Sequence, residues 1–197
     1  MFILNNSDIN LQLKLIELLI SEINRIHREF SEEYFKDNEK IKLNKTHKDN
    51  FPIKQVLKYR LNLHESIIDY LMLMDKRSYH FEYRVKTNES IIYKVNKNLA
   101  GNEHYPVNRW LNDIFGCRIV VEKELLNNIL NSLELWKVKH NLMSYYTRDK
   151  DGYKGTHIYF KNKDNGYYPW ELQVWDSDNL VSNIESHKKY KREFLRE

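Results

Sequence analysis

The chain has 197 residues, of which 41% are hydrophobic, and this suffices for one ordinary domain with a buried core. Lysine and arginine number 32 and aspartate and glutamate 28, so the formal charge of +4 permits a polyanionic partner without requiring one. One cysteine, Cys117, excludes an internal disulfide and a cysteine-based zinc cluster, and we interpret it as a small buried hydrophobe. No apolar run approaches the ~20 residues of a membrane span, and no signal peptide is recognisable, so we expect a cytoplasmic protein.

Two long helices are predicted in the first 75 residues. The first follows a Ser7 or Asp8 cap, and its apolar stripe recurs at helical spacing: Ile9, Leu13, Ile16, Ile20, Ile23 and Phe30. Residues 31–50 carry many charges of both signs, and we interpret them as a mobile connection or a short solvated helix. Pro52 suits a helix start, because its missing N–H costs nothing there, and the second helix should reach about Asp75. Its apolar face is expected to hold Val56, Tyr59, Leu63, Ile67, Tyr70 and Met74.

The rest of the chain alternates strands with helices. We expect strands over residues 80–86, 119–121, 137–146, 157–160 and 170–175. We expect helical segments over residues 90–99, 108–112, 122–135 and 178–196, and turns at Asp151-Gly152 and Asn165-Gly166. This alternation predicts an α/β (α+β) fold in which helices pack on a mixed sheet of about five strands. We expect a single domain over 1–197, with a helical extension over 1–50 and a catalytic core over 51–197.

Four short blocks hold the candidate functional residues. In the first, Arg84 and Lys86 point to one face of a strand, and Ser90 and Lys94 share one face of the next helix. Three cations and a hydroxyl at a strand-to-helix junction could hold a triphosphate, and ordinary surface cations are the alternative.

The second and fourth blocks each contain a carboxylate. Asp113 precedes Gly116, which permits a sharp bend, and Arg118, which enters an apolar strand. An aspartate at a strand mouth suits magnesium, and a helix cap is the alternative. Glu171 and Gln173 share one face of a strand that otherwise reads as buried. A buried carboxylate needs a partner, and a metal ion is an obvious one.

The third block places Tyr153 and Lys154 in a turn ahead of a strand that contains His157. An exposed tyrosine at such a turn can stack on a nucleotide base. A hairpin turn with a packing tyrosine is the alternative interpretation.

In this order the four blocks resemble the RelA/SpoT-type alarmone synthetase family. The family motifs read R-x-K-x-x-x-S-x-x-x-K, D-x-x-G-x-R, G-Y-x-x-x-H and E-x-Q, and every letter is matched between residues 84 and 173. The resemblance covers roughly residues 59–191, and it implies a nucleotidyltransferase-like synthetase fold. It also implies an ATP-dependent enzyme that moves pyrophosphate to a ribose hydroxyl, with no hydrolase signature of the His-Asp type ahead of the synthetase part.

The resemblance implies a role for each matched residue. The ATP-binding residues would be Arg84 and Arg118 around the adenine and Lys86, Ser90 and Lys94 on the phosphates. Asp113 and Glu171 would be catalytic and would bind Mg²⁺, with Glu171 also activating the attacking hydroxyl. On the acceptor side, Tyr153 would stack on the base, and the other acceptor-binding residues would be Lys154, His157 and Gln173.

The identity of the acceptor is suggested by the fourth block. In synthetases of guanosine alarmones the glutamine is usually followed by an aliphatic residue, arginine and threonine, whereas here Val174, Trp175 and Asp176 follow. Residues 153–160 and 169–175 look more like the toxic branch, whose members pyrophosphorylate the 3′ hydroxyl of the tRNA CCA end and stop translation. The resemblance thus implies a tRNA acceptor and an antitoxin partner. GDP, GTP or AMP as acceptor is the alternative, and a non-catalytic nucleotide- or tRNA-binding module is another.

A tRNA acceptor needs a basic surface beside the active site. The C-terminal candidates for this surface are Lys188, Lys189, Lys191 and Arg192. The segment from Lys36 to Lys48 is a second candidate. For both, the alternative is a solvated helix face, since glutamates dilute the charge.

Overall fold

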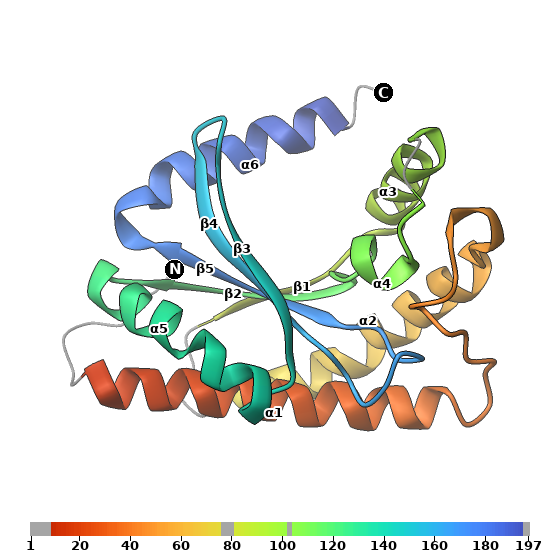
Figure 1. Ribbon diagram of the computed structural model, residues 1–197, viewed down its shortest axis with the longest axis horizontal. Coiled ribbons are helices and arrows are strands. Elements are labelled where there is room, and N and C mark those ends of the chain that lie inside the picture. The colour runs from red at the N-terminus through yellow and green to blue at the C-terminus, as the bar shows by residue number, and fades with distance from the viewer. Residues whose placement is uncertain (1–8, 76–80, 102–103, 195–197) are drawn as a thin grey trace.

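A five-stranded mixed sheet lies at the centre of the computed structural model, which describes residues 9–75, 81–101 and 104–194 (Figure 1). The strands are β1 (Glu82–Val85), β2 (Phe115–Val121), β3 (Leu142–Lys150), β4 (Tyr153–Phe160) and β5 (Trp170–Asp176). Their order is β1-β2-β5-β4-β3, with β2 and β5 parallel and the other neighbouring pairs antiparallel. The predicted α+β class and mixed sheet are confirmed.

The helices lie on both sides of this sheet (Figure 1). One side carries α1 (Ile9–Tyr34), α2 (Ile53–Asp75) and α5 (Lys123–Lys139). The other side is flanked by α3 (Asn88–Ala100) and the short α4 (Val107–Trp110) at one end and by α6 (Leu180–Phe194) at the other. Short 3₁₀ turns occur at Lys48–Asn50 and Ser177–Asn179. The space between α3 and α6 leaves the middle of that sheet face uncovered by helices, and the candidate site lies there.

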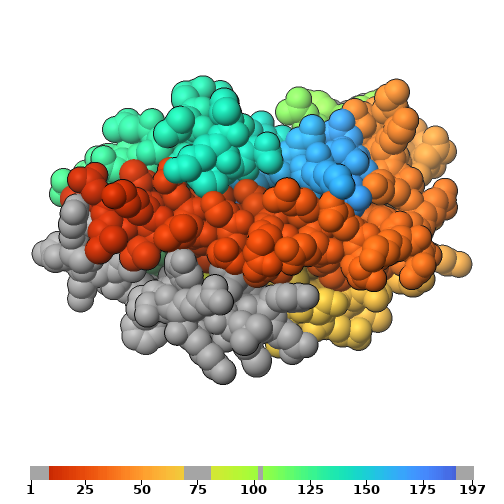
Figure 2. Space-filling view, turned by 90° about the horizontal axis from the view of Figure 1, so that it is seen from below, coloured from red at the N-terminus to blue at the C-terminus, as the bar shows by residue number. Residues whose placement is uncertain are grey.

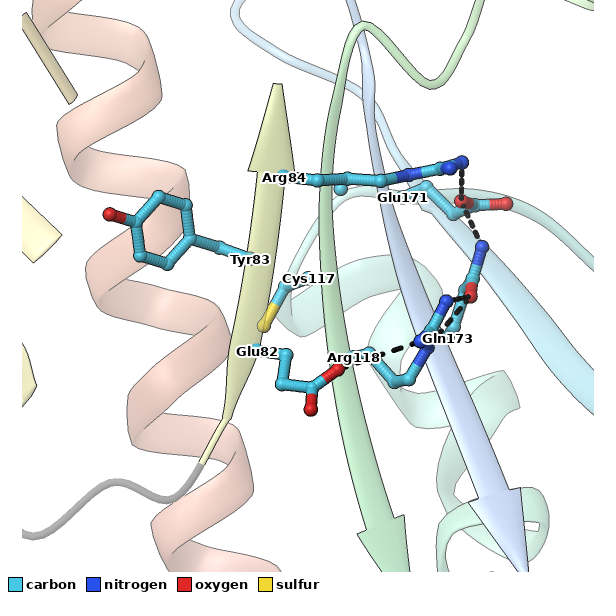
Figure 3. Close-up of a pocket in the computed structure, with 8 residues that line it drawn as sticks. Glu82, Tyr83, Arg84, Cys117, Arg118, Glu171 and Gln173 are labelled. Carbon is cyan, nitrogen blue, oxygen red and sulfur yellow. Dashed lines mark hydrogen bonds and ion pairs between the residues drawn. The ribbon is translucent and has the colours of Figure 1, made fainter. Parts of the chain in front are cut away.

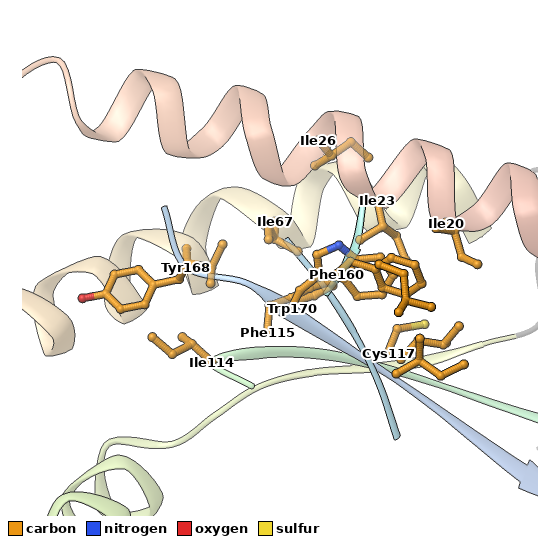
Figure 4. Close-up of a cluster of buried hydrophobic side chains, with 14 of the residues drawn as sticks. Ile20, Ile23, Ile26, Ile67, Ile114, Phe115, Cys117, Phe160, Tyr168 and Trp170 are labelled. Atoms are coloured by element: carbon orange, nitrogen blue, oxygen red, sulfur yellow. The ribbon is translucent and has the colours of Figure 1, made fainter. Parts of the chain in front are cut away.

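The main core fills the side that α1, α2 and α5 cover. Phe115, Cys117 and Ile119 of β2 alternate toward this side, because successive side chains of a strand point to opposite faces. Figure 4 shows Ile20 and Ile23 of α1 above Phe115 and Cys117. Cys117 is buried, which raises the pKa of its thiol and agrees with the interpretation of a small hydrophobe. In the space-filling view α1 forms a band across the molecule with α5 beside it (Figure 2).

The two long helices are confirmed close to their predicted bounds. The stripe residues Ile16, Ile20 and Ile23 are buried, as are Val56, Tyr59, Leu63 and Ile67 of α2. The predicted core roles of Tyr70 and Met74 lie outside the described side chains. Among the described residues, no helix has the length and apolar character that crossing a membrane would require.

The prediction of a mobile or solvated segment over residues 31–50 was wrong. α1 continues to Tyr34, and Leu43 is completely buried in the main core. The Leu43 N–H donates to the Asn165 carbonyl at 2.8 Å, and its carbonyl accepts from the Asn108 N–H at 3.3 Å. A single apolar residue among charged neighbours has no periodicity, so its partners, far away in the chain, could not be predicted.

Two strands are longer than predicted and one begins later. β2 starts at Phe115, so Gly116 lies within a strand and does not form the expected bend. β4 starts at Tyr153, directly after a hairpin turn in which Asp151 and Gly152 have positive φ, as a two-residue turn requires. The strand expected from residue 137 was wrong at its start: α5 runs to Lys139, and Asn141, at φ 57°, ends it.

Candidate active site

Two adjacent rows of paired residues cross the open face of the sheet. Residues directly opposite one another on neighbouring strands point to the same face. In strand order from β1 to β3, the first row is Arg84, Gly116, Glu171, Tyr159 and Ser144. The second row is Glu82, Arg118, Gln173, His157 and Tyr146. All four sequence blocks thus contribute residues to one surface of the sheet.

Glu171 is the buried carboxylate at the centre of these rows, 2% exposed. Its Oε1 accepts from the Tyr159 hydroxyl at 2.9 Å and from His157 Nδ1 at 2.8 Å, and its Oε2 accepts from Gln173 Nε2 at 2.7 Å. Burial raises the pKa of this carboxyl, but the His157 hydrogen bond and nearby Arg84 outweigh burial, so the net pKa is below its usual value. The carboxylate therefore stays ionised although it is buried.

Asp113 lies just before β2 and is surrounded by cations. Lys86 Nζ contacts Oδ2 at 2.6 Å, Lys94 Nζ contacts Oδ1 at 2.9 Å, and Arg84 lies 3.9 Å from Oδ2. Burial opposes ionisation of Asp113, yet these charges together hold its pKa well below the usual range. Burial, aided by repulsion from Lys94 and Arg84, lowers the pKa of Lys86. Three cations around one carboxylate leave positive charge for an anion.

Ser90 lies in the first turn of α3, next to this cationic cluster. Thr87 caps the helix by accepting from the Ser90 N–H at 3.3 Å, and its hydroxyl donates to the Ser90 hydroxyl at 3.1 Å. The first block is therefore brought together: Lys86, directly after β1, and Lys94 of α3 both reach Asp113 of the second block.

The donor set of the site fits a magnesium ion. Arg84 Nη2 lies 3.9 Å from both Asp113 Oδ2 and Glu171 Oε2, so the two carboxylates face one cationic nitrogen. The Arg84 side chain is 43% exposed and can leave that position. Within the described residues no cluster of three or more His, Cys, Asp or Glu side chains could hold a metal. Magnesium here would depend on two carboxylates and on substrate phosphates, which is how proteins often bind it.

A hollow lies between Arg84 and Arg118 on the β1–β2 side of Glu171 (Figure 3). Arg118 stacks 3.8 Å over the Trp175 ring and donates to Gln173 Oε1 at 2.9 and 3.2 Å, which fixes its plane. Gly116 lines the hollow, and a Cβ there would lie 3.6 Å from Glu171 Oε2. Two guanidinium groups beside such a hollow suit a flat aromatic base.

Tyr153 does not have the exposed position that was predicted for it. The side chain is 6% exposed, its hydroxyl accepts from Trp175 Nε1 at 3.0 Å, and it lies 2.9 Å from His157 Nε2. The reason is that β4 begins at this residue, so Tyr153 points inward beneath His187 of α6 instead of outward from a loop. Gly155 makes the arrangement possible, because a Cβ there would come within 2.7 Å of the Tyr153 hydroxyl.

The structure also corrects the assignment of Lys154 to the acceptor side. Strand alternation directs Lys154 away from the face that carries Tyr153 and His157, and its Nζ pairs with Asp149 at 3.1 Å. His157 and Gln173 pair with each other in the row next to that of Glu171, and both contact its carboxylate. Gln173 additionally joins Glu171 to Arg118, so it contacts the donor side as well.

The basic residues predicted for tRNA are only partly within the described structure. Lys188 and Lys189 are exposed on α6, next to His187, whose ring packs on Tyr153 and Trp175. Lys191 and Arg192 belong to the same helix, but their side chains lie outside the described part. In the second candidate segment, Lys36 pairs with Glu33.

Sequence reasoning missed two residues of the site. Tyr159 donates to Glu171, and Tyr146 stacks on His157 with ring centroids 4.9 Å apart and planes 6° apart. Tyr159 lies two residues after His157 on a strand, and that spacing was the available signal. Tyr146 could be assigned to the site only from the pairing of β3 with β4, which places it opposite His157.

The family model described as "Region found in RelA / SpoT proteins" matches residues 83–194, more than half of the chain. The protein therefore belongs to the RelA/SpoT family. No similar sequence is found among curated proteins.

Three solved structures resemble this chain. A GTP pyrophosphokinase family protein from Streptococcus pneumoniae is 20% identical, with a TM-score of 0.42 over 71% of this chain and 74% of that one. Small alarmone synthetase 1 from Bacillus subtilis bound to AMPCPP is 18% identical, with a TM-score of 0.38 over 73% and 77%. Another structure of that synthetase is 19% identical, with a TM-score of 0.41 over the same shares.

Proposed function

We propose that the protein is an ATP-dependent pyrophosphotransferase that moves the β,γ-pyrophosphate of ATP to a ribose 3′-hydroxyl. The observation that carries this proposal is the position of Glu171. It is a buried, ionised carboxylate between a hollow flanked by two arginines and a row of acceptor-side groups, and it lies beside a cluster of three cations on Asp113. Membership of the RelA/SpoT family supports the same reaction class.

The donor would lie on the β1–β2 side. Its adenine would stack between Arg84 and Arg118, and its phosphates would contact Lys86, Lys94 and the Ser90 hydroxyl at the start of α3. Charge-assisted contacts of this kind are stronger than neutral hydrogen bonds, and they favour the charge that spreads over the phosphoryl oxygens during transfer. Magnesium bound by Asp113 and Glu171 would neutralise further phosphate charge.

In the reaction the ribose oxygen forms a bond to the β-phosphorus, the bridge between the α- and β-phosphorus breaks, and AMP leaves. The proton of the attacking hydroxyl needs an acceptor, and Glu171 is the buried carboxylate available. Its Oε2 accepts one hydrogen bond from Gln173, whereas Oε1 accepts two, so Oε2 keeps the greater capacity to accept a proton. Positioning and charge neutralisation then supply most of the catalysis.

We further propose that the acceptor is the tRNA 3′-CCA end, so that the protein acts in the cytoplasm as a toxin that an antitoxin restrains. Support comes from the likeness of residues 169–175 to the toxic branch and from exposed Lys188 and Lys189 near the acceptor side. We propose one synthetase domain over 1–197, because α1 belongs to the same core as β2 and β5.

Transfer of label from γ-labelled ATP tests the proposal. Purified protein with Mg²⁺ would be offered tRNA, tRNA lacking CCA, GDP, GTP or AMP, with Glu171→Ala as the blank. We expect label on tRNA that is lost when CCA is removed. Label on a free nucleotide would identify an alarmone synthetase instead, and label on no acceptor would favour a non-catalytic binding module.

A further inference from the structure

The direction from which an acceptor can reach Glu171 follows from the sheet. The hollow for the donor base occupies the β1–β2 side, so an in-line attack requires the hydroxyl to arrive from the β4–β3 side. On that side the two rows end in Ser144 and Tyr146 of β3, which is an edge strand. An acceptor larger than one nucleotide must therefore pass over β3.

The face of β3 that adjoins the site carries one exposed aromatic residue. Tyr146 is 48% exposed, whereas Tyr153 and Tyr159 on the same face of β4 are 6% and 7% exposed. The Tyr146 ring is held parallel to His157, which contacts Glu171, so its orientation is fixed relative to the catalytic carboxylate. A fixed ring with open surface is a stacking platform, because less conformational entropy is lost when a base binds it.

A cation follows on the same face. Arg148 lies two residues after Tyr146, is exposed, and pairs across the ladder with Gly155, with its guanidinium carbon 5.7 Å from the Tyr153 ring centroid. Within the described part of the chain no carboxylate forms an ion pair with Arg148. An aromatic residue followed by a cation along an open strand is the pattern with which proteins hold single-stranded nucleic acid.

We propose that this face of β3, carrying Tyr146 and Arg148, binds the unpaired nucleotides of an RNA 3′ end, with a base on Tyr146 and a backbone phosphate on Arg148. This inference rests on the proposed function, since it assigns to the acceptor a strand that extends beyond the reacting ribose. It replaces buried Tyr153 as the stacking residue and leaves that tyrosine the role of orienting His157.

Binding without reaction provides the test. A 5′-fluorescein-labelled single-stranded oligoribonucleotide ending in CCA would be titrated with the protein in the absence of ATP, and fluorescence anisotropy measured. We expect Tyr146→Ala to weaken binding by about tenfold or more, as loss of one stacked base does, and Tyr146→Trp to retain it. Arg148→Ala should weaken binding and reduce its dependence on salt concentration.

The matched control is Tyr145→Ala. Tyr145 is 41% exposed on the same strand but pairs with Ile158, so it points to the opposite face, and we expect binding within about twofold of wild type. Equal effects of the two tyrosine substitutions, or no binding of the oligonucleotide by the wild-type protein, would overturn the inference. Failure of label transfer with intact, Tyr146-dependent binding would instead count against the proposed reaction alone.

Discussion

At the scale of single residues, the site depends on how Glu171 is surrounded. The three side chains that donate to it lie on two strands, and each has a further partner: His157 lies on Tyr146, Gln173 accepts from Arg118, and Tyr159 stacks near Tyr146. Such a connected network keeps a buried charge stable and fixes its direction. Replacement of one member therefore changes orientation as well as charge.

Glu171→Gln should remove pyrophosphate transfer while the protein stays folded. The amide keeps the volume of the side chain but loses the negative charge and the basic oxygen, so we expect a rate lower by about 10²–10⁴-fold, the usual contribution of a general base. Label transfer measures the rate and thermal unfolding checks the fold. A variant that is folded and fully active would remove Glu171 from the mechanism.

Gly155→Ala should destabilise the protein because the new Cβ would lie 2.7 Å from the Tyr153 hydroxyl and 2.9 Å from Trp175. Overpacking of this kind costs about 1–3 kcal/mol, and urea unfolding would measure it. Gly101→Ala is the control, since its Cβ would come no closer than 3.6 Å to another atom. Equal stability of the two variants would show that Trp175 can move aside.

At the scale of elements, strand pairing decides which side chains meet. Asp113, Glu171 and His157 are far apart in the sequence, and they converge because β2 pairs with β5 and β5 pairs with β4. The segment between α1 and α2 contributes in another way. Leu43 is buried in the core, and its backbone hydrogen bonds join this segment to Asn108 of α4 and to Asn165 in the loop before β5.

Leu43→Ala should cost about 2–5 kcal/mol of stability, as expected for removing a fully buried leucine. Lys45→Ala, an exposed neighbour in the same segment, should change stability by less than about 0.5 kcal/mol. Urea denaturation with unchanged m-values would measure both free energies of unfolding. A small effect of Leu43→Ala would restore the interpretation of a loosely attached connection.

At the scale of the whole molecule, α1 is joined to the far end of the chain through a buried histidine. His27 Nε2 donates to the Tyr168 carbonyl at 2.9 Å, while its Nδ1 has no partner in the described structure. Burial lowers the pKa of His27 to about 4. The unfolded chain, with a pKa near 6.5, therefore binds a proton that the folded protein does not over the range between these values.

The stability contributed by this group should thus be present at neutral pH and fall as the pH drops below about 6.5, with no further loss below about 4. The loss amounts to about 2 kcal/mol between pH 7.5 and 5. Comparison of wild type with His27→Gln by urea unfolding at several pH values isolates the pH-dependent stability that His27 contributes. A stability curve for His27→Gln that runs parallel to that of the wild type over this pH range would contradict the assignment.

The sequence by itself determined the long helices, the α+β class, and the residue types of the site. Apolar periodicity depends on neighbours within a few turns, so α1 and α2 could be placed closely, and the motif residues from Arg84 to Gln173 could be named. Prediction from the sequence failed for residues whose contacts lie far away in the chain. The sequence suggested a bend at Gly116 and an exposed turn position for Tyr153. Both residues belong to strands, and this depends on pairing with neighbouring strands.

Only the tertiary structure decided which side chains face one another. It placed three cations around Asp113, gave Glu171 its three donors, buried Tyr153, and left Tyr146 open at the sheet edge. The physical reason is that strand order and register are set by packing of the whole core, and a shift of one residue would turn every side chain to the other face. Strand order and register therefore cannot be predicted from short segments of the sequence.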